Sequence, residues 1–237
     1  MRFEVLATDY DGTLAHHGSV APETISALER LRRSGRRAFM VTGREIEDLK
    51  NIFSRLDLFD VVVAENGALL YYPANGEIKL LHGPPTEQFI QELRNRKVAP
   101  LSVGHVIVAT YEPHEATVLD VIKKLGLELE IIFNKGSVMV LPTGVNKATG
   151  LKAALRQTSS VREKTVAVGD AENDHAFLTF SGFGVAVSNA VPALKKEADL
   201  VTSAPHGLGV IELIDRLIAD GLEGAPPAAW RQQGVML

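Results

Sequence analysis

The chain of 237 residues contains no cysteine, which excludes disulfide bonds, thiolate metal ligands and a cysteine nucleophile together. No apolar run approaches the ~18 residues that a membrane span needs, and residues 1–7 do not resemble a signal peptide. The net charge of −4 gives no general attraction to nucleic acid or to anionic lipid. We therefore predict a cytoplasmic protein that binds neither nucleic acid nor membranes and acts on a small molecule.

The residues that are present are typical of a folded protein. Hydrophobic residues make up 46% of the chain and charged residues 23%, which is far from the composition of a disordered segment. The length exceeds that of most single domains, so the alternatives are one large α/β domain or a core that carries a smaller insert.

Strands and helices alternate in the first and last parts of the chain. Apolar runs predict buried strands at residues 3–8, 38–41, 61–64, 165–168, 184–187 and 200–201. Helical spacing of apolar residues predicts helices at residues 22–34, 46–56, 146–157 and 207–220. This βαβ order predicts a parallel sheet with helices on both faces, whose functional groups gather beyond the carboxyl ends of the strands.

The middle of the chain has a different pattern. A hairpin is predicted around Asn75-Gly76, and Gly83-Pro84-Pro85 follows it like a hinge. Residues 86–141 then predict a helix, a strand at 103–110, a second helix and two strands. We therefore predict an α/β fold, in which a Rossmann-like three-layer core with a parallel sheet carries a small inserted α/β cap domain.

The predicted boundaries follow from these two patterns. The core comprises residues 1–82 and 143–222, and the cap comprises residues 83–142. Residues 223–237 are rich in Ala, Pro and Gln and are predicted to be a tail or linker. If the chain is a fragment of a longer protein, a further C-terminal domain follows this tail.

Asp9 and Asp11 stand two residues apart at the end of the first strand. Their carboxylates emerge near one point, and their repulsion favours a bound cation, for which magnesium is the natural candidate beside a phosphate. A solvated turn is the commoner reason for an isolated Asp-x-Asp. The pair therefore indicates a metal site only if the ends of the other strands also carry suitable residues.

A second acidic group follows the strand at 165–168. Asp170, Asn173 and Asp174 could cap the next helix, but capping requires only one carboxylate. Two acidic strand ends in one parallel sheet converge on the same crevice, which favours a metal site.

Two further strand and helix ends carry groups suited to phosphate. Thr42 and Gly43 follow the second strand, where a hydroxyl and backbone N–H groups could donate to phosphate oxygens. Lys147 begins the helix that returns the chain to the core, where its charge could face an anionic substrate. The order of these motifs across four strand–helix junctions is more specific than any one of them.

Together the motifs resemble the haloacid dehalogenase (HAD) superfamily phosphatases, of the Cof-like branch (subfamily IIB), in which a C2-type α/β cap lies between the second and third motifs. The four motifs match in chain order at residues 9–14, 42–44, 147 and 169–174. Residues 65–68, Glu-Asn-Gly-Ala, also resemble a segment at the edge of that branch's active site. The resemblance covers roughly residues 3–219.

The resemblance implies a role for each matching residue. Asp9 would attack phosphorus and form an aspartyl phosphate, and Asp11 would serve as the acid and the base. Mg2+ would be held by Asp9, Asp170 and the Asp11 backbone carbonyl, with support from Asp174. The groups expected at the phosphate are Thr42, Gly43, Lys147 and Asn173, and those expected at the rest of the substrate are Arg44 and Asn66.

The predicted function is therefore a Mg2+-dependent phosphatase that hydrolyses a small phosphorylated metabolite, such as a sugar phosphate, phosphoglycolate or a similar phosphomonoester. A phosphomutase or phosphotransferase would use the same aspartyl phosphate, and a receiver-like signalling domain or a binding module without turnover would keep the acceptor alone. The cap residues that select the substrate cannot be located from periodicity.

Overall fold

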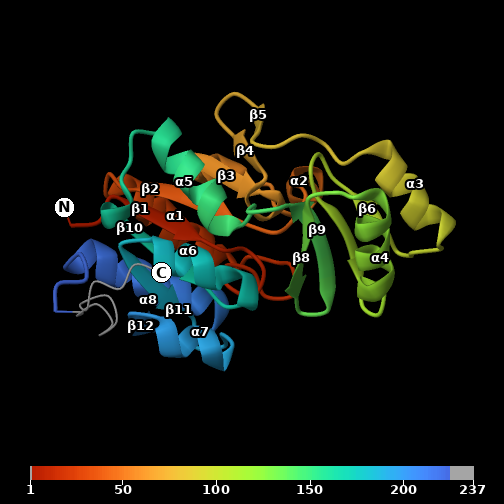
Figure 1. Cartoon of the computed structure of the whole chain (residues 1–237). Coiled ribbons are helices and arrows are strands. Elements are labelled where there is room, and N and C mark those ends of the chain that lie inside the picture. Colours follow the sequence, from red (N-terminus) through yellow and green to blue (C-terminus); the bar gives the residue numbers. More distant parts are fainter. Residues whose placement is uncertain (1, 225–237) are drawn as a thin grey trace.

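The computed structural model describes residues 2–224, which form two β-sheets with helices packed against them (Figure 1). The larger sheet has eight strands in the order β12-β11-β10-β1-β2-β3-β4-β5. These strands are β1 (Val5–Thr8), β2 (Arg37–Val41), β3 (Val61–Ala64), β4 (Leu69–Tyr72), β5 (Glu77–Leu80), β10 (Thr165–Gly169), β11 (Phe183–Ala186) and β12 (Leu200–Val201). The first six in the spatial order are parallel, and β4 and β5 form an antiparallel hairpin at one edge.

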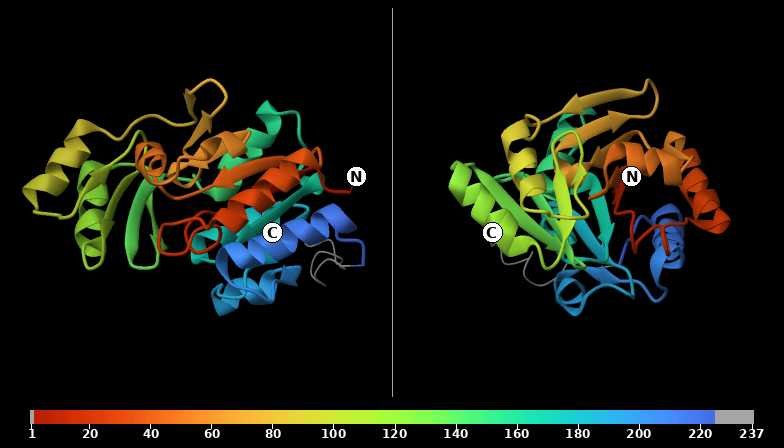
Figure 2. Two further views of the ribbon diagram at one scale, coloured as in Figure 1. Left: turned by 180° about the vertical axis from the view of Figure 1, so that it is seen from behind. Right: turned by 90° about the vertical axis from the view of Figure 1, so that its right-hand side faces the viewer.

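Helices cover both faces of this sheet. They are α1 (Pro22–Arg33), α2 (Ile46–Ile52), α5 (Lys147–Gln157), α6 (His175–Phe180), α7 (Pro192–Glu197) and α8 (His206–Ala219). The pair α5 and α6 lies on the face seen in Figure 1, and the pair α1 and α8 lies on the opposite face, seen in the left view of Figure 2. The predicted Rossmann-like three-layer core is confirmed.

The central strands are apolar because both of their faces are covered. All four residues of β1 are buried, as are all four of β3, which explains their continuous rather than alternating apolar pattern. β1 lies between β10 and β2, with Thr8 level with Val168 on one side and with Met40 on the other. The residues that follow these three strands therefore emerge side by side at one edge of the sheet.

The smaller sheet is antiparallel and lies beyond that edge (Figure 1). It has the order β6-β7-β9-β8 and comprises β6 (Ser102–Val103), β7 (Val108–Tyr111), β8 (Leu129–Asn134) and β9 (Ser137–Pro142). The helices α3 (Glu87–Asn95) and α4 (Glu115–Leu125) share a separate apolar core with one face of it. Residues of its other face, including Met139, pack with Ala68 and Val145 from the side of the larger sheet.

Two predicted elements were wrong in detail. The single strand at 103–110 is instead a hairpin, in which β6 and β7 are joined by a turn closed by a hydrogen bond from the Gly104 N–H to the Ile107 carbonyl (2.9 Å). The helix at 46–56 ends at Ile52, because Phe53 takes an extended conformation, and a separate 3-10 turn follows at Leu56–Leu58. The apolar residues of both segments are buried or partly buried except Ile52, which is 40% exposed, so the main difference is in the local geometry.

The predicted tail at 223–237 falls mostly on residues 225–237, which lie outside the described part of the chain. The proposed division into a core and a cap at residues 83–142 stays a prediction. Within residues 2–224, no helix combines the length and the apolar character that crossing a membrane would require.

Candidate active site

Three polar residues follow three neighbouring strands. Asp9 follows β1, Asp170 follows β10 on one side, and Thr42 follows β2 on the other. The Asp9 N–H donates to the Val168 carbonyl (2.9 Å), which continues the ladder between β1 and β10 by one residue. The sheet therefore brings Asp9 and Asp170 to the same point, although 161 residues separate them in the chain.

Asp9, Asp170 and Asp174 form a buried acidic cluster, in which one carboxylate oxygen from each lies within 4.8 Å of the others. One oxygen of Asp174 accepts hydrogen bonds from the N–H groups of Asp170 and Ala171 (2.8 and 2.9 Å), which fixes the turn after β10. One oxygen of Asp174 therefore caps the turn after β10, and its other oxygen accepts a hydrogen bond from Lys147. Three carboxylates this close repel one another unless a cation neutralises them.

Lys147 supplies part of that positive charge from the start of α5. Its Nζ lies 2.6 Å from Asp9 Oδ1 and 2.5 Å from Asp174 Oδ1, and the side chain is only 2% exposed. The Asn146 side chain caps the helix by accepting from the N–H groups of Ala148 and Thr149. Lys147 is therefore held at the first residue of a capped helix, whose amino-terminal field also attracts anions.

The close approach of α5 to the turn after β3 depends on two glycines. Gly67 has φ +107°, and a Cβ atom there would lie 2.0 Å from the Asn146 carbonyl oxygen. A Cβ atom on Gly150 would lie 2.5 Å from the Cα of Gly67. No larger residue fits at either position, so the glycine pair sets how deeply Lys147 enters the site.

Burial and the neighbouring carboxylates raise the pKa values of two members of the acidic cluster, Asp9 and Asp170. Burial raises the pKa of Asp9, the charges of Asp174 and Asp170 raise it further, and Lys147 opposes both. Burial likewise raises the pKa of Asp170. Burial alone would lower the pKa of Lys147, but Asp174 and Asp9 outweigh it and raise that pKa. Three carboxylates face two lysines, Lys147 and Lys135, and the remaining negative charge favours a further cation.

The acidic cluster fits a hard divalent cation. Its three donors are carboxylate oxygens, which Mg2+ prefers, and Thr13 and Lys135 already hydrogen-bond the two oxygens of Asp170 (3.2 and 2.7 Å). The Asp11 carboxylate, in contrast, is not part of the cluster. The expected contribution of Asp11 to the metal was its backbone carbonyl, and that contribution stays a prediction.

The Asp11 side chain is held by Arg44. Nε and Nη2 of Arg44 donate to the two carboxylate oxygens of Asp11 (2.6 and 2.8 Å), and Nη1 donates to Asp48 (2.5 Å). The side chain of Asp11 is 40% exposed, whereas that of Asp9 is 5% exposed. The two aspartates of the motif therefore differ in environment, one buried beside a lysine and the other open to the pocket.

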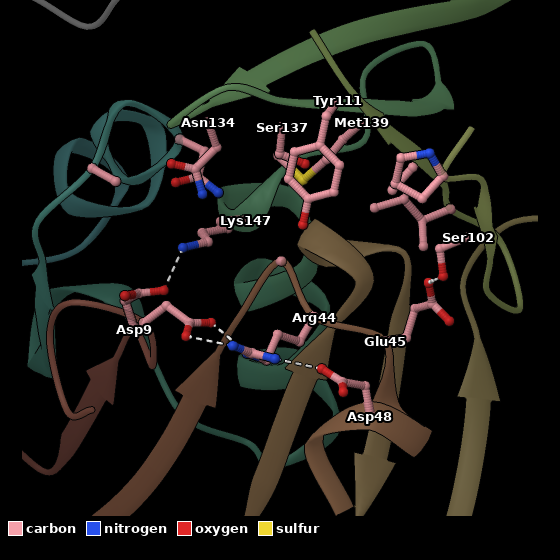
Figure 3. Close-up of a pocket in the computed structure, with 17 residues that line it drawn as sticks. Asp9, Arg44, Glu45, Asp48, Ser102, Tyr111, Asn134, Ser137, Met139 and Lys147 are labelled. Carbon is pink, nitrogen blue, oxygen red and sulfur yellow. Dashed lines mark hydrogen bonds and ion pairs between the residues drawn. The ribbon is translucent and has the colours of Figure 1, made fainter. Parts of the chain in front are cut away.

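A pocket of about 380 Å³ separates these residues from the smaller sheet (Figure 3). Its wall on the side of the larger sheet is formed by Asp9, Asp11, Gly43, Arg44, Glu45, Asp48, Lys147, Ala171 and Asn173. Its other wall is formed by Pro100, Ser102, Ile107, Ala109, Tyr111, Asn134, Ser137 and Met139. Asp9 and Lys147 lie toward one end of the pocket, and Glu45 and Ser102 lie toward the other.

The remaining expected residues are grouped around this pocket. Asn173 lines it and donates to the Asn66 side chain (3.1 Å), while Asn66 itself is buried behind. Thr42 is buried and does not line the pocket, and its hydroxyl accepts from the Arg44 N–H (3.1 Å). Gly43 faces Met139, because a Cβ atom there would lie 3.5 Å from the sulfur.

Glu65 is the residue that sequence reasoning missed. It is fully buried, and its carboxylate accepts hydrogen bonds from three consecutive N–H groups, those of residues 105, 106 and 107, at 2.7–2.9 Å. Glu65 thus joins the end of β3 to the turn between β6 and β7. Glu65 lies in the segment at 65–68 that resembles the family, which marked it as a residue near the active site. The sequence did not show which backbone N–H groups its carboxylate would bind.

We expect Glu65→Ala to lower the free energy of unfolding by about 2–4 kcal/mol, because it leaves three buried N–H groups without an acceptor. Hydrogen exchange measured by mass spectrometry should show faster exchange at residues 105–107. Glu87→Gln, at a side chain that is 79% exposed, serves as the control and should change stability by less than about 0.5 kcal/mol. Unchanged exchange at residues 105–107 would contradict this role for Glu65.

Comparison with known proteins identifies the class of this enzyme. A model of the family described as haloacid dehalogenase-like hydrolase matches residues 6–103 and 86–214. The chain therefore belongs to the haloacid dehalogenase-like hydrolases. The predicted membership is confirmed, and with it the prediction of a phosphomonoester hydrolase of this superfamily.

Individual relatives match along almost their whole length. The chain is 29% identical over 221 residues to "Phosphoglycolate phosphatase 2" of Saccharolobus solfataricus, covering 91% of this chain and 92% of the relative. It is 30% identical over 222 residues to "Phosphoglycolate phosphatase" of Methanothermobacter thermautotrophicus, covering 90% and 98%. A solved sugar phosphatase of HAD subclass IIB has the same fold, with a TM-score of 0.73 at 23% identity over 90% of this chain and 98% of its own.

Proposed function

We propose that the chain is a Mg2+-dependent phosphatase that hydrolyses a small phosphomonoester through an aspartyl phosphate on Asp9. The observation that carries this proposal is the placement of Asp9, which lines the pocket and also belongs to the buried acidic cluster with Asp170 and Asp174. An attacking carboxylate, a cation site and a substrate cavity thereby share one residue. The phosphorus would sit beside Asp9, and the rest of the substrate would extend along the pocket.

In the first step, a carboxylate oxygen of Asp9 forms a bond to phosphorus while the bond from phosphorus to the ester oxygen breaks. The leaving oxygen takes a proton from Asp11, which releases the alcohol. Asp11 can reach the leaving oxygen because its carboxyl group is open to the pocket. The two hydrogen bonds from Arg44 suit its ionised form, so the acid form requires that one of them is released.

In the second step, a water molecule attacks phosphorus and the bond to the Asp9 oxygen breaks, which restores the carboxylate and releases inorganic phosphate. Asp11, now ionised, takes the proton from this water. Across both steps one phosphomonoester and one water yield one alcohol and one phosphate, and both aspartates return to their starting states.

The phosphoryl oxygens need positive charge and donors throughout. Asp9, Asp170 and Asp174 would hold Mg2+, with the Asp11 backbone carbonyl, and the bound ion would reduce the repulsion between the Asp9 carboxylate and the phosphate. Lys147 supplies a fixed ammonium, and Gly43 and Asn173 supply donors on the pocket wall. The role of Thr42 would be to orient this loop, and Asn66 would position Asn173.

The segment at 83–142 is proposed to act as a cap that closes the pocket and selects the alcohol part of the substrate. About half of the lining residues come from it, including Tyr111 and Met139. The names of the relatives make phosphoglycolate one candidate substrate, and sugar phosphates are another class. Phosphate release from these compounds, with and without Mg2+, tests the proposed function.

Removing divalent metal with a chelator should abolish phosphate release, and adding Mg2+ should restore it, because the two lysines beside the acidic cluster leave one of its three carboxylate charges unbalanced. Mg2+ at about a hundredfold excess over its dissociation constant should also stabilise the fold by about 2.7 kcal/mol. Thermal unfolding measures this shift, and Asp170→Asn should reduce it. Full activity after exhaustive chelation would rule out the metal role.

A further inference from the structure

The pocket has two chemically different ends. At one end lie Asp9 and Lys147, which would face the phosphoryl group (Figure 3). At the other end lie Glu45 and Asp48, which would face the alcohol that leaves, and Arg44 lies between the two ends, bound to Asp11 and Asp48. We define the leaving-group end as these three residues together with Asp11 and the cap residues opposite them.

The charge of the leaving-group end is negative. Glu45 and Asp48 contribute two carboxylates and Arg44 contributes one guanidinium, while Asp11 carries the proton that it gives to the leaving oxygen, so two negative charges and one positive charge sum to −1. Arg44 is already engaged, because Nε, Nη1 and Nη2 all donate to Asp11 or Asp48. A carboxylate on the substrate would have to displace one of these partners to reach the guanidinium.

The cap adds no compensating cation to this end. The eight lining residues on the cap side are all uncharged. The Ser102 hydroxyl donates to Glu45, and Asn134 lies near Lys147 at the phosphoryl end (Figure 3). The nearby cap lysine, Lys135, is instead directed to Asp170, with its Nζ 2.7 Å from Oδ2. Its charge therefore serves the acidic cluster and the phosphoryl end.

The acceptors at the leaving-group end favour a substrate that donates hydrogen bonds. Glu45 and Asp48 present carboxylate oxygens there. Both residues line the pocket. Hydroxyl and amino groups can donate to such oxygens, whereas an ionised carboxylate can only accept.

We infer that the substrate's leaving group carries hydroxyl or amino donors and no negative charge, so that a polyol, sugar or amino-alcohol phosphate is preferred over a phosphorylated carboxylic acid. This inference rests on the proposed function and narrows it. The inferred substrate differs from the one in the names of the relatives, which is phosphoglycolate. Hydrolysis of phosphoglycolate releases glycolate, which is an anion. The exposed ring of Tyr111 provides an apolar surface against which a sugar ring or an ammonium group can pack.

Three phosphomonoesters of equal length test the inference: phosphoglycolate, 2-hydroxyethyl phosphate and 2-aminoethyl phosphate. They differ only in a terminal carboxylate, hydroxyl or ammonium group. We expect kcat/KM for phosphoglycolate to be at least about tenfold lower than for either of the others, because like charges face each other only in that complex. Where turnover is too slow, the order is read from competition against p-nitrophenyl phosphate.

A charge-neutralising variant connects the preference to the pocket. Glu45→Gln removes one negative charge from the leaving-group end, so the disadvantage of phosphoglycolate relative to 2-hydroxyethyl phosphate should shrink by about threefold or more. Glu47→Gln is the matched control, because Glu47 lies two residues further on, pairs with Lys50 and is 64% exposed outside the pocket. It should leave the ratio unchanged.

The outcomes separate the inference from the proposed function. Asp9-dependent hydrolysis of p-nitrophenyl phosphate tests the proposed function. The order of kcat/KM among the three esters tests the inference. If that hydrolysis occurs but phosphoglycolate equals or exceeds the other two, the inference is wrong and the function stands. If no Asp9-dependent hydrolysis occurs at all, the proposed function fails and the inference fails with it.

Discussion

Asp9→Asn should reduce phosphate release by at least about 10³-fold, because the amide cannot form the acyl phosphate through which both steps proceed. The loss should appear in kcat for every substrate, since it does not depend on the leaving group. Initial rates with saturating Mg2+ measure it. Asp57→Asn, at an ion-paired side chain that is 63% exposed, is the matched control and should keep wild-type rates.

The same substitution should leave the fold intact or make it more stable. Burial and the charges of Asp170 and Asp174 raise the pKa of Asp9, so the charged form of Asp9 is disfavoured in the folded state without metal. Replacing it by a neutral amide removes repulsion, and Lys147 keeps its ion pair with Asp174. Thermal unfolding in chelator should show an unchanged or higher midpoint. A variant that is well folded and retains more than about a tenth of wild-type activity would refute Asp9 as the nucleophile.

The arrangement of the core could be predicted from the sequence because it depends on regular patterns. Buried parallel strands are continuously apolar, and the runs ending at Thr8, Val41 and Val168 therefore marked three neighbouring strands. The carboxyl ends of parallel strands share one edge, so the convergence of Asp9 and Asp170 followed from topology alone. The hairpin of β4 and β5 was predicted for another reason, the turn signal of Asn75-Gly76.

Other features depend on contacts between distant parts of the chain, which no local pattern reports. The sequence pattern of β6 and β7 resembles one strand, because Val106 and Ile107 of the turn between them are apolar and buried, where Glu65 accepts from their N–H groups. The Arg44 pair with Asp11 likewise joins residues 33 positions apart. The charge at the leaving-group end of the pocket is set by such pairings, and only the structure shows them.

Lys147→Met should lower the free energy of unfolding without metal by about 3–5 kcal/mol, because it leaves Asp9 and Asp174 buried with no counter-ion. It should also lower kcat by about 10²–10³-fold, since a fixed positive charge at the phosphoryl group is lost. Urea unfolding and phosphate release measure the two effects. Lys152→Met, at an exposed position of the same helix α5, is the control and should change neither strongly.

Two further measurements can show that the Lys147→Met variant loses stability because a charge is removed. Mg2+ should stabilise the Lys147→Met variant more than the wild type, because the bound cation then replaces the positive charge that Lys147 places between the carboxylates of Asp9 and Asp174. Adding Asp174→Asn to Lys147→Met should recover part of the stability but none of the activity, since it removes an unpaired charge without restoring the ammonium. Equal Mg2+ stabilisation of variant and wild type, together with no recovery in the double variant, would mean that Lys147 supports the site by packing alone.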